Sequence, residues 1–291
     1  MSLEMVVSGG RRRLAFRVRP LCVPPSPDGI FGPGSVIRTL YADSVCLLGA
    51  GTALLLQLAH PSIAQGVHEH SEYESHPLAR LFGTLFAVNT VVFGSRDEAA
   101  RIGAAITGVH EHVTGDGYRA LDPELLCWVN ATLLGCAVPL YERIIRPFSG
   151  AERDELARDS RLVGAVFGCP IEAQPSDWSG FEEYWEQAVS SLTVSDTARR
   201  VAASLLAGRG LPLRPAWAPP LAVSRAVTAA TLPPRIRDGY GLPWERRDQL
   251  IARSTLALAK AVLPRMPEHW RQLGPELLRS AGRPEAVAAA T

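Results

Sequence analysis

The chain has 291 residues, of which 47% are hydrophobic and 20% are charged, and its formal net charge is +1. This length suits one large domain or two small ones, and the composition is ordinary for a globular protein with a sizeable core. The near-neutral charge gives no electrostatic reason to expect nucleic acid or a strongly acidic partner, so a small or apolar ligand is favoured.

The cysteines and the apolar runs indicate a cytoplasmic protein. The 5 cysteines are scattered without a C-x-x-C pair, which predicts neither a disulfide framework nor a zinc site. No apolar region follows Arg11 to Arg13, so we expect no secretory signal. The longest apolar run, residues 45–59, is shorter than the roughly 20 residues that span a bilayer and indicates a core helix. Peripheral membrane contact and homo-oligomerisation stay open.

The pattern along the chain predicts an all-α fold. Segments rich in Ala, Leu, Arg and Glu alternate with Pro/Gly breaks, and period-2 alternation is almost absent. Residues 1–34, rich in Pro and Gly, are expected to form an N-terminal arm, and residues 35–291 a single helical domain. The first helix is expected to run from residue 35 through 59, with close helix packing at Gly49 and Gly51. It should break at His60-Pro61, because proline disfavours helical geometry in the preceding residue.

The later helices carry recognisable start signals. A helix is expected to resume near Gly66, and the next over residues 77–93. Ser95 and Glu98 form a capping box that begins a helix over about 96–113, and Ser149 and Glu152 form a second one for about 150–167. Between them, Pro123 suits the first turn of a helix reaching about residue 145. Further helices are expected over residues 178–189, 198–206, 216–231 and 246–262.

Histidines mark the region where a functional site is expected. Six of the 7 histidines lie between His60 and His112, beside the most apolar run. Neutral imidazole is a common ligand of metals and haem iron and a common acid/base group. His110 borders an apolar stripe on its predicted helix, whereas His112 is turned further away; the stripe comprises Ile102, Ile106, Val109 and Val113. This is the placement that a proximal haem ligand needs. The alternative is a core histidine bonded to a backbone carbonyl.

A second pair, Arg80 and Thr84, lies at i and i+4, so both side chains project from one helical face. A guanidinium and a hydroxyl so placed can hold a carboxylate, including a haem propionate. The alternative is a surface arginine and a threonine bonded to a helix carbonyl.

Other site classes lack their motifs. No histidine pair among residues 60–76 has the H-E-x-x-H spacing of a metalloprotease. His60 ends the apolar run and is expected to face a pocket, whereas His68 and His76 are expected to be solvated. The chain also has no G-x-x-x-x-G-K phosphate loop and no G-x-S-x-G elbow, which argues against nucleotide binding and serine-hydrolase chemistry.

Several motifs, taken in order, resemble one family. They are L-L-L-Q-L-A-H-P-S-I-A-Q-G-V-H-E-H-S at 54–71, H-P-L-A-R-L-F-G-T-L at 76–85, T-V-V-F-G at 90–94, V-H-E-H-V-T-G at 109–115 and Y-R-A-L-D-P-E-L-L-C-W-V-N-A-T-L at 118–133. Together they resemble the oxygenase family that includes latex clearing protein (rubber oxygenase) and the fungal mycophenolic-acid pathway cleavage oxygenase. The resemblance covers roughly residues 35–190 and is strongest over 54–146.

The resemblance implies haem b in an all-helical, globin-like bundle with a buried haem pocket. It assigns His110 as the proximal ligand of the iron, Arg80 and Thr84 as the pair near the haem, and His60 and His70 as pocket residues and candidates for catalysis.

The chain also departs from the family pattern. It has Asn130 where many relatives have histidine and Gly83 where rubber oxygenase has lysine, and no glutamate aligns with the proposed catalytic base of that enzyme. These departures argue against polyisoprene cleavage.

The leading hypothesis is a haem b-dependent oxygenase or related oxidative enzyme. It would act on a small, rather apolar substrate with dioxygen or peroxide, in secondary-metabolite biosynthesis. One alternative is a non-catalytic haem or hydrophobic-ligand binding protein, a sensor or carrier. Another keeps the enzyme but replaces haem with a non-haem metal at His60 and His70.

Overall fold

Helices make up nearly all of the regular structure. The computed structural model describes residues 3–8, 11–16, 26–71, 77–207, 214–267 and 271–272, with side chains from residue 26 onward except those of 77–82 and 214–217. The described residues form twelve α-helices: α1 (Val36–Ala42), α2 (Ala50–Leu58), α3 (Pro61–His70), α4 (Pro77–Phe93), α5 (Arg96–His110), α6 (Pro123–Ile144), α7 (Gly150–Val166), α8 (Trp178–Ser191), α9 (Asp196–Leu206), α10 (Arg214–Thr231), α11 (Pro234–Gly239) and α12 (Arg246–Val262). The predicted all-α, multi-helix bundle is confirmed.

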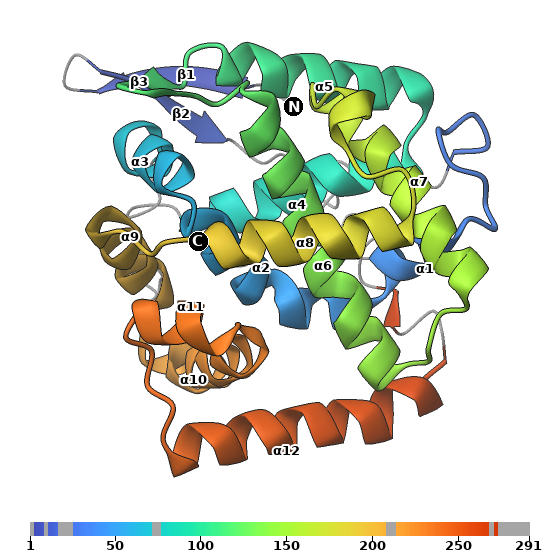
Figure 1. The fold of residues 1–291 in the computed structure, drawn as a ribbon, viewed down its shortest axis with the longest axis vertical. Coiled ribbons are helices and arrows are strands. Elements are labelled where there is room, and N and C mark those ends of the chain that lie inside the picture. The colour runs from blue at the N-terminus through green and yellow to red at the C-terminus, as the bar shows by residue number, and fades with distance from the viewer. Residues whose placement is uncertain are drawn as a thin grey trace, which may run out of the picture.

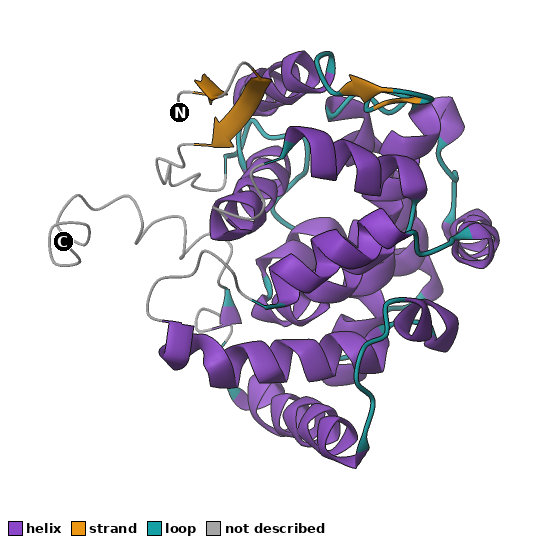
Figure 2. Ribbon diagram, turned by 90° about the vertical axis from the view of Figure 1, so that its left-hand side faces the viewer, coloured by secondary structure: helices purple, strands orange, loops and turns teal. Residues whose placement is uncertain are grey.

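The remaining elements are short. Three 3-10 helices, η1 (Ser44–Gly49), η2 (Ile171–Ala173) and η3 (Leu263–Arg265), connect or extend the α-helices. Strands β1 (Leu3–Ser8) and β2 (Arg11–Phe16) pair antiparallel, as do β3 (Thr114–Gly115) and β4 (Tyr118–Arg119). Figure 2 shows these strands at the edge of an otherwise helical body. The sequence pattern did not predict the β1–β2 hairpin, although Gly9-Gly10 between its strands is a recognised hairpin signal.

The expected continuous helix over residues 35–59 is wrong. The chain leaves the helix at Asp43, which is extended, and continues as η1 before α2 begins. The Asp43 side chain accepts a hydrogen bond from the backbone N–H of Val45 at 3.0 Å, so it caps the new helix instead of continuing the old one. The break at His60-Pro61 is confirmed, but α3 begins at once, with Pro61 in its first turn, and not near Gly66.

The core is built around α6, which passes through the middle of the molecule (Figure 1). It packs against η1, α2, α7 and α8, and side chains such as Leu134 and Ile144 are fully buried. By length and composition it is the one described single helix that could cross a bilayer, but 72% of its apolar window is buried inside the fold. It therefore packs as the core helix of this bundle.

Close packing at Gly49 and Gly51 is confirmed. A Cβ at Gly49 would lie 3.1 Å from the carbonyl oxygen of Cys136 on α6. At Gly51 it would lie 2.2 Å from Oγ1 of Thr228 on α10. Only glycine allows the chain to approach both helices this closely.

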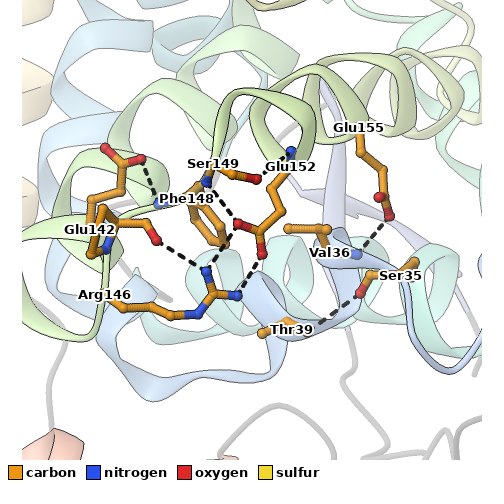
Figure 3. Close-up of polar contacts among 10 residues, drawn as sticks. Ser35, Val36, Thr39, Glu142, Arg146, Phe148, Ser149, Glu152 and Glu155 are labelled. Atoms are coloured by element: carbon orange, nitrogen blue, oxygen red, sulfur yellow. Dashed lines mark hydrogen bonds and ion pairs between the residues drawn. The ribbon is translucent and has the colours of Figure 1, made fainter.

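Both predicted capping boxes are present, and the second belongs to a larger polar cluster (Figure 3). Ser149 and Glu152 begin α7, and Glu152 also receives two hydrogen bonds from Arg146, at 2.7 and 3.1 Å. One turn further along α7, Glu155 accepts a 2.9 Å hydrogen bond from the backbone N–H of Val36. The start of α1 is thus capped by a side chain of α7, since the Ser35 side chain makes no capping bond.

Candidate functional site

Three of the predicted site residues lie on one helix pair. Helices α4 and α5 are joined by residues 94–95 and pack against each other, so the beginning of α4 and the end of α5 are the parts of the pair farthest from this connection. Arg80 belongs to the first turn of α4, Thr84 to its second, and His110 is the last residue of α5. The hairpin therefore brings the three residues to the same end of the pair. The side chain of Arg80 lies outside the described side chains, and Thr84 is exposed.

The predicted apolar stripe of α5 is buried toward its beginning and opens toward its end. Ile102 is buried and Ile106 packs against the core, whereas Val109 and Val113 are half-buried. The imidazole of His110 lies at this open end, half-buried, with its Nδ1 atom buried. His112 is exposed, and its Nδ1 lies 2.8 Å from the carbonyl oxygen of Gly108 on the same helix. Of the two histidines, His110 is the one set toward the interior.

His60 occupies the N-cap of α3, where its side chain is 23% exposed. Its Nε2 lies 4.0 Å from Oε1 of Glu124 in the first turn of α6. Its Nδ1 is buried and has no hydrogen-bond partner in the part of the chain that the structure describes. Burial lowers the pKa of His60, and the nearby Glu124 only partly opposes this effect. A neutral imidazole with a buried nitrogen is chemically suited to ligation or proton transfer.

His70 lies at the other end of α3, about 15 Å along the helix axis from His60. Its Nε2 lies 3.1 Å from the carbonyl oxygen of Thr114 in β3 and 3.9 Å from Oε2 of Glu69. The two histidines thus have different surroundings. Within the described ranges, no three His, Cys, Asp or Glu side chains are arranged to hold a metal ion.

The carboxylate of Glu69, beside His70, was not predicted as part of a site from the sequence. Glu69 accepts hydrogen bonds of 2.6 Å from the hydroxyl of Tyr118 and of 2.6 Å from Nε2 of Gln65. These bonds lower the pKa of Glu69, while burial and the bond to Glu69 raise the pKa of Tyr118. The cluster fastens α3 to the β3–β4 hairpin. Tyr118 is 49 residues from Glu69, and no local spacing signals such a contact.

Asn130 serves to connect helices. Its Nδ2 donates to the carbonyl oxygen of Ser160 on α7 and to Oε1 of Gln174, both at 2.9 Å. Gly164 makes room for this contact, since a Cβ there would lie 2.9 Å from Nδ2 of Asn130. The departure from the family pattern at this position is therefore accompanied by a hydrogen-bond network joining α6, α7 and the residues after η2.

The donor set fits a porphyrin better than a multidentate metal centre. A haem iron needs one axial imidazole from the protein, apolar walls and cations near its propionates. His110 offers a half-buried imidazole at the end of α5, and the buried Val88 and Val91 lie on α4, which packs against α5. The buried, unpartnered Nδ1 of His60 adds a second neutral imidazole on α3.

Comparison with known proteins supports the resemblance carried by the motifs. The family model described as "ER-bound oxygenase mpaB/B'/Rubber oxygenase, catalytic domain" matches residues 38–261, which is more than half of the chain. The match extends past residue 190, where the resemblance described above ends, and reaches from α1 into α12. No curated protein and no solved structure matches the chain.

Proposed function

The chain belongs to the mpaB/rubber oxygenase catalytic-domain family, and from this membership we propose that it is a haem b-dependent oxygenase acting on a small, rather apolar substrate. The observation that carries the proposal is the α4–α5 hairpin, which brings Arg80, Thr84 and the half-buried His110 to one end. When bound, haem supplies the redox-active iron at which dioxygen or peroxide is used.

Different residues would hold the iron and the propionates of the cofactor. His110 would bind the iron from the end of α5, a helix that is held in the fold by the buried part of its apolar stripe. Arg80 and Thr84 would hold a propionate, the arginine through charge-assisted and the threonine through neutral hydrogen bonds. Residues of elements other than α4 and α5 would then contact the substrate.

His60 is the candidate for proton transfer. Burial keeps its imidazole neutral, so Nδ1 can accept a proton from the substrate or from a bound water molecule. Since Gly83 replaces the lysine of rubber oxygenase, we assign the chain a small substrate and not a polymer.

Absorption spectroscopy with a matched pair of variants tests the cofactor. We expect the purified protein, after reconstitution with hemin, to show a Soret band and a pyridine haemochrome spectrum of haem b. His110→Ala should abolish haem retention, whereas His112→Ala should keep it, because His112 is exposed and bonded to its own helix. Equal retention by both variants would show that His110 is not the ligand.

Two further outcomes separate the alternatives. Carbon monoxide should shift the Soret band of the reduced protein, since an oxygenase needs an open iron position. Haem without carbon monoxide binding would indicate a carrier or sensor with two axial ligands. Bound metal without porphyrin would select a non-haem centre.

A further inference from the structure

Helix α12 presents an unusual outward face. It runs along the lower edge of the molecule (Figure 1) and packs on α10 and α6 through buried side chains, Ala252 and Leu256. On the opposite side, Leu250 is 66% exposed and Leu258 is 64% exposed. These are the two most exposed large hydrophobic side chains among the described residues.

Basic side chains flank this apolar strip. Arg246, Arg253 and Lys260 are spaced seven residues apart and are all exposed, so they form a row beside Leu250. Arg247 lies between Leu250 and Leu258 around the helix axis and is also exposed. Within the described ranges, none of these four cations forms an ion pair, and the two acidic residues of this end, Glu245 and Asp248, are engaged in the capping box of α12.

We propose that this face of α12 binds the surface of an anionic lipid bilayer. An interfacial helix buries leucines in the headgroup boundary and sets Lys and Arg against the negative lipid surface. The row of cations beside exposed leucines has this composition. The proposal does not depend on the haem assignment, because no residue of this face belongs to the candidate site.

Two other occupants fit the face less well. A second copy of the chain, packed face to face on α12, would bring two rows of unpaired cations together. A nucleic acid or an acidic protein would neutralise the cations but leave the exposed leucines without an apolar partner. A bilayer provides both kinds of partner at once.

Vesicle cosedimentation tests the proposal with the full-length protein. We expect binding to phosphatidylcholine vesicles that contain phosphatidylserine and little binding to phosphatidylcholine alone. The pair Leu250→Gln and Leu258→Gln, and separately the triple change Arg246→Gln, Arg253→Gln and Lys260→Gln, should each lower the partition coefficient by about tenfold or more. All five positions are solvent-exposed, so circular dichroism and haem content should not change.

Matched changes elsewhere control for hydrophobicity and charge. Leu162→Gln removes a leucine that is 40% exposed on α7, and Arg101→Gln, Arg158→Gln and Arg200→Gln remove three exposed charges from α5, α7 and α9. Both controls should bind vesicles like the unchanged protein.

Several results would overturn the proposal. These are absence of binding by the unchanged protein, an equal loss in the controls, and loss of binding in the charge variant alone, which would mean that Leu250 and Leu258 do not enter the bilayer. A dimer in analytical ultracentrifugation that the leucine variant dissociates would assign the face to a second copy.

Discussion

At the scale of the residue, ionisation of the Asp159 carboxyl on α7 lowers the free energy of unfolding. Burial, and then the charge of Glu155, raise the pKa of Asp159 to about 6 from the ordinary value of 3.8. Below pH 4 both the folded and the unfolded chain hold the proton. Between pH 4 and 6 the unfolded chain releases it first, so the free energy of unfolding falls as the pH rises and stays lower above pH 6.

Asp159→Asn should therefore stabilise the protein at pH 7 by ~1 kcal/mol, a value reduced for solvent screening because the carboxyl is half-buried. Urea unfolding at several pH values measures the effect as the difference between the two proteins. That difference should vanish below pH 4. If the variant and the unchanged protein were equally stable at pH 7, the pKa of Asp159 would lie at its ordinary value.

At the scale of the element, the helix packing depends on glycines that permit close contact. Gly51→Ala places a Cβ 2.2 Å from Oγ1 of Thr228, so the Thr228 side chain must rotate or α2 and α10 must move apart. We expect a loss of about 1–3 kcal/mol in the free energy of unfolding, as for other overpacked cores. The control is Gly150→Ala at the start of α7, where a Cβ would meet nothing within 4 Å and the stability should be unchanged or slightly raised. Equal effects of both changes would contradict the close contact.

Elements with local signals could be predicted from the sequence, and those that depend on distant contacts could not. The two capping boxes and the break at His60 follow from neighbouring residues, and the structure contains all three. The interruption after α1 was missed although it too has a local cause, since the Asp43 carboxylate caps η1 through the backbone N–H of Val45, two residues further on. The cap of α1 by Glu155 joins residues 119 positions apart, which periodicity cannot reveal.

The candidate site, too, could be predicted from the sequence only in part. Residue spacing predicted His110 beside an apolar stripe, and the structure has His110 half-buried at the open end of that stripe. The placement of Arg80 and Thr84 on one helical face stays a prediction, because the side chain of Arg80 lies outside the described side chains. The Glu69–Tyr118 contact could not be predicted from the sequence, because it depends on how the β3–β4 hairpin packs on α3.

At the scale of the whole molecule, an ion pair connects opposite regions of the sequence. Nη1 of Arg271 lies 2.8 Å from Oδ2 of Asp43, and both side chains are largely buried. Arg271→Ala leaves the Asp43 carboxylate buried without this cation, so we expect a loss of ~3 kcal/mol at pH 7. Thermal unfolding followed by circular dichroism measures it. Arg271→Lys, which keeps the charge, should recover part of the loss. An unchanged melting temperature for Arg271→Ala would mean that the pair contributes nothing to the fold.

The same ion pair has a consequence for synthesis on the ribosome. Asp43 emerges early, but Arg271 follows 228 residues later, after every described helix has been translated. Until then the junction of α1 and η1 lacks this counter-charge, and the helices around it assemble without their final connection. We therefore expect a chain that ends after η3, with every described helix but without Arg271, to be more sensitive to proteases near residue 43 than the full-length protein.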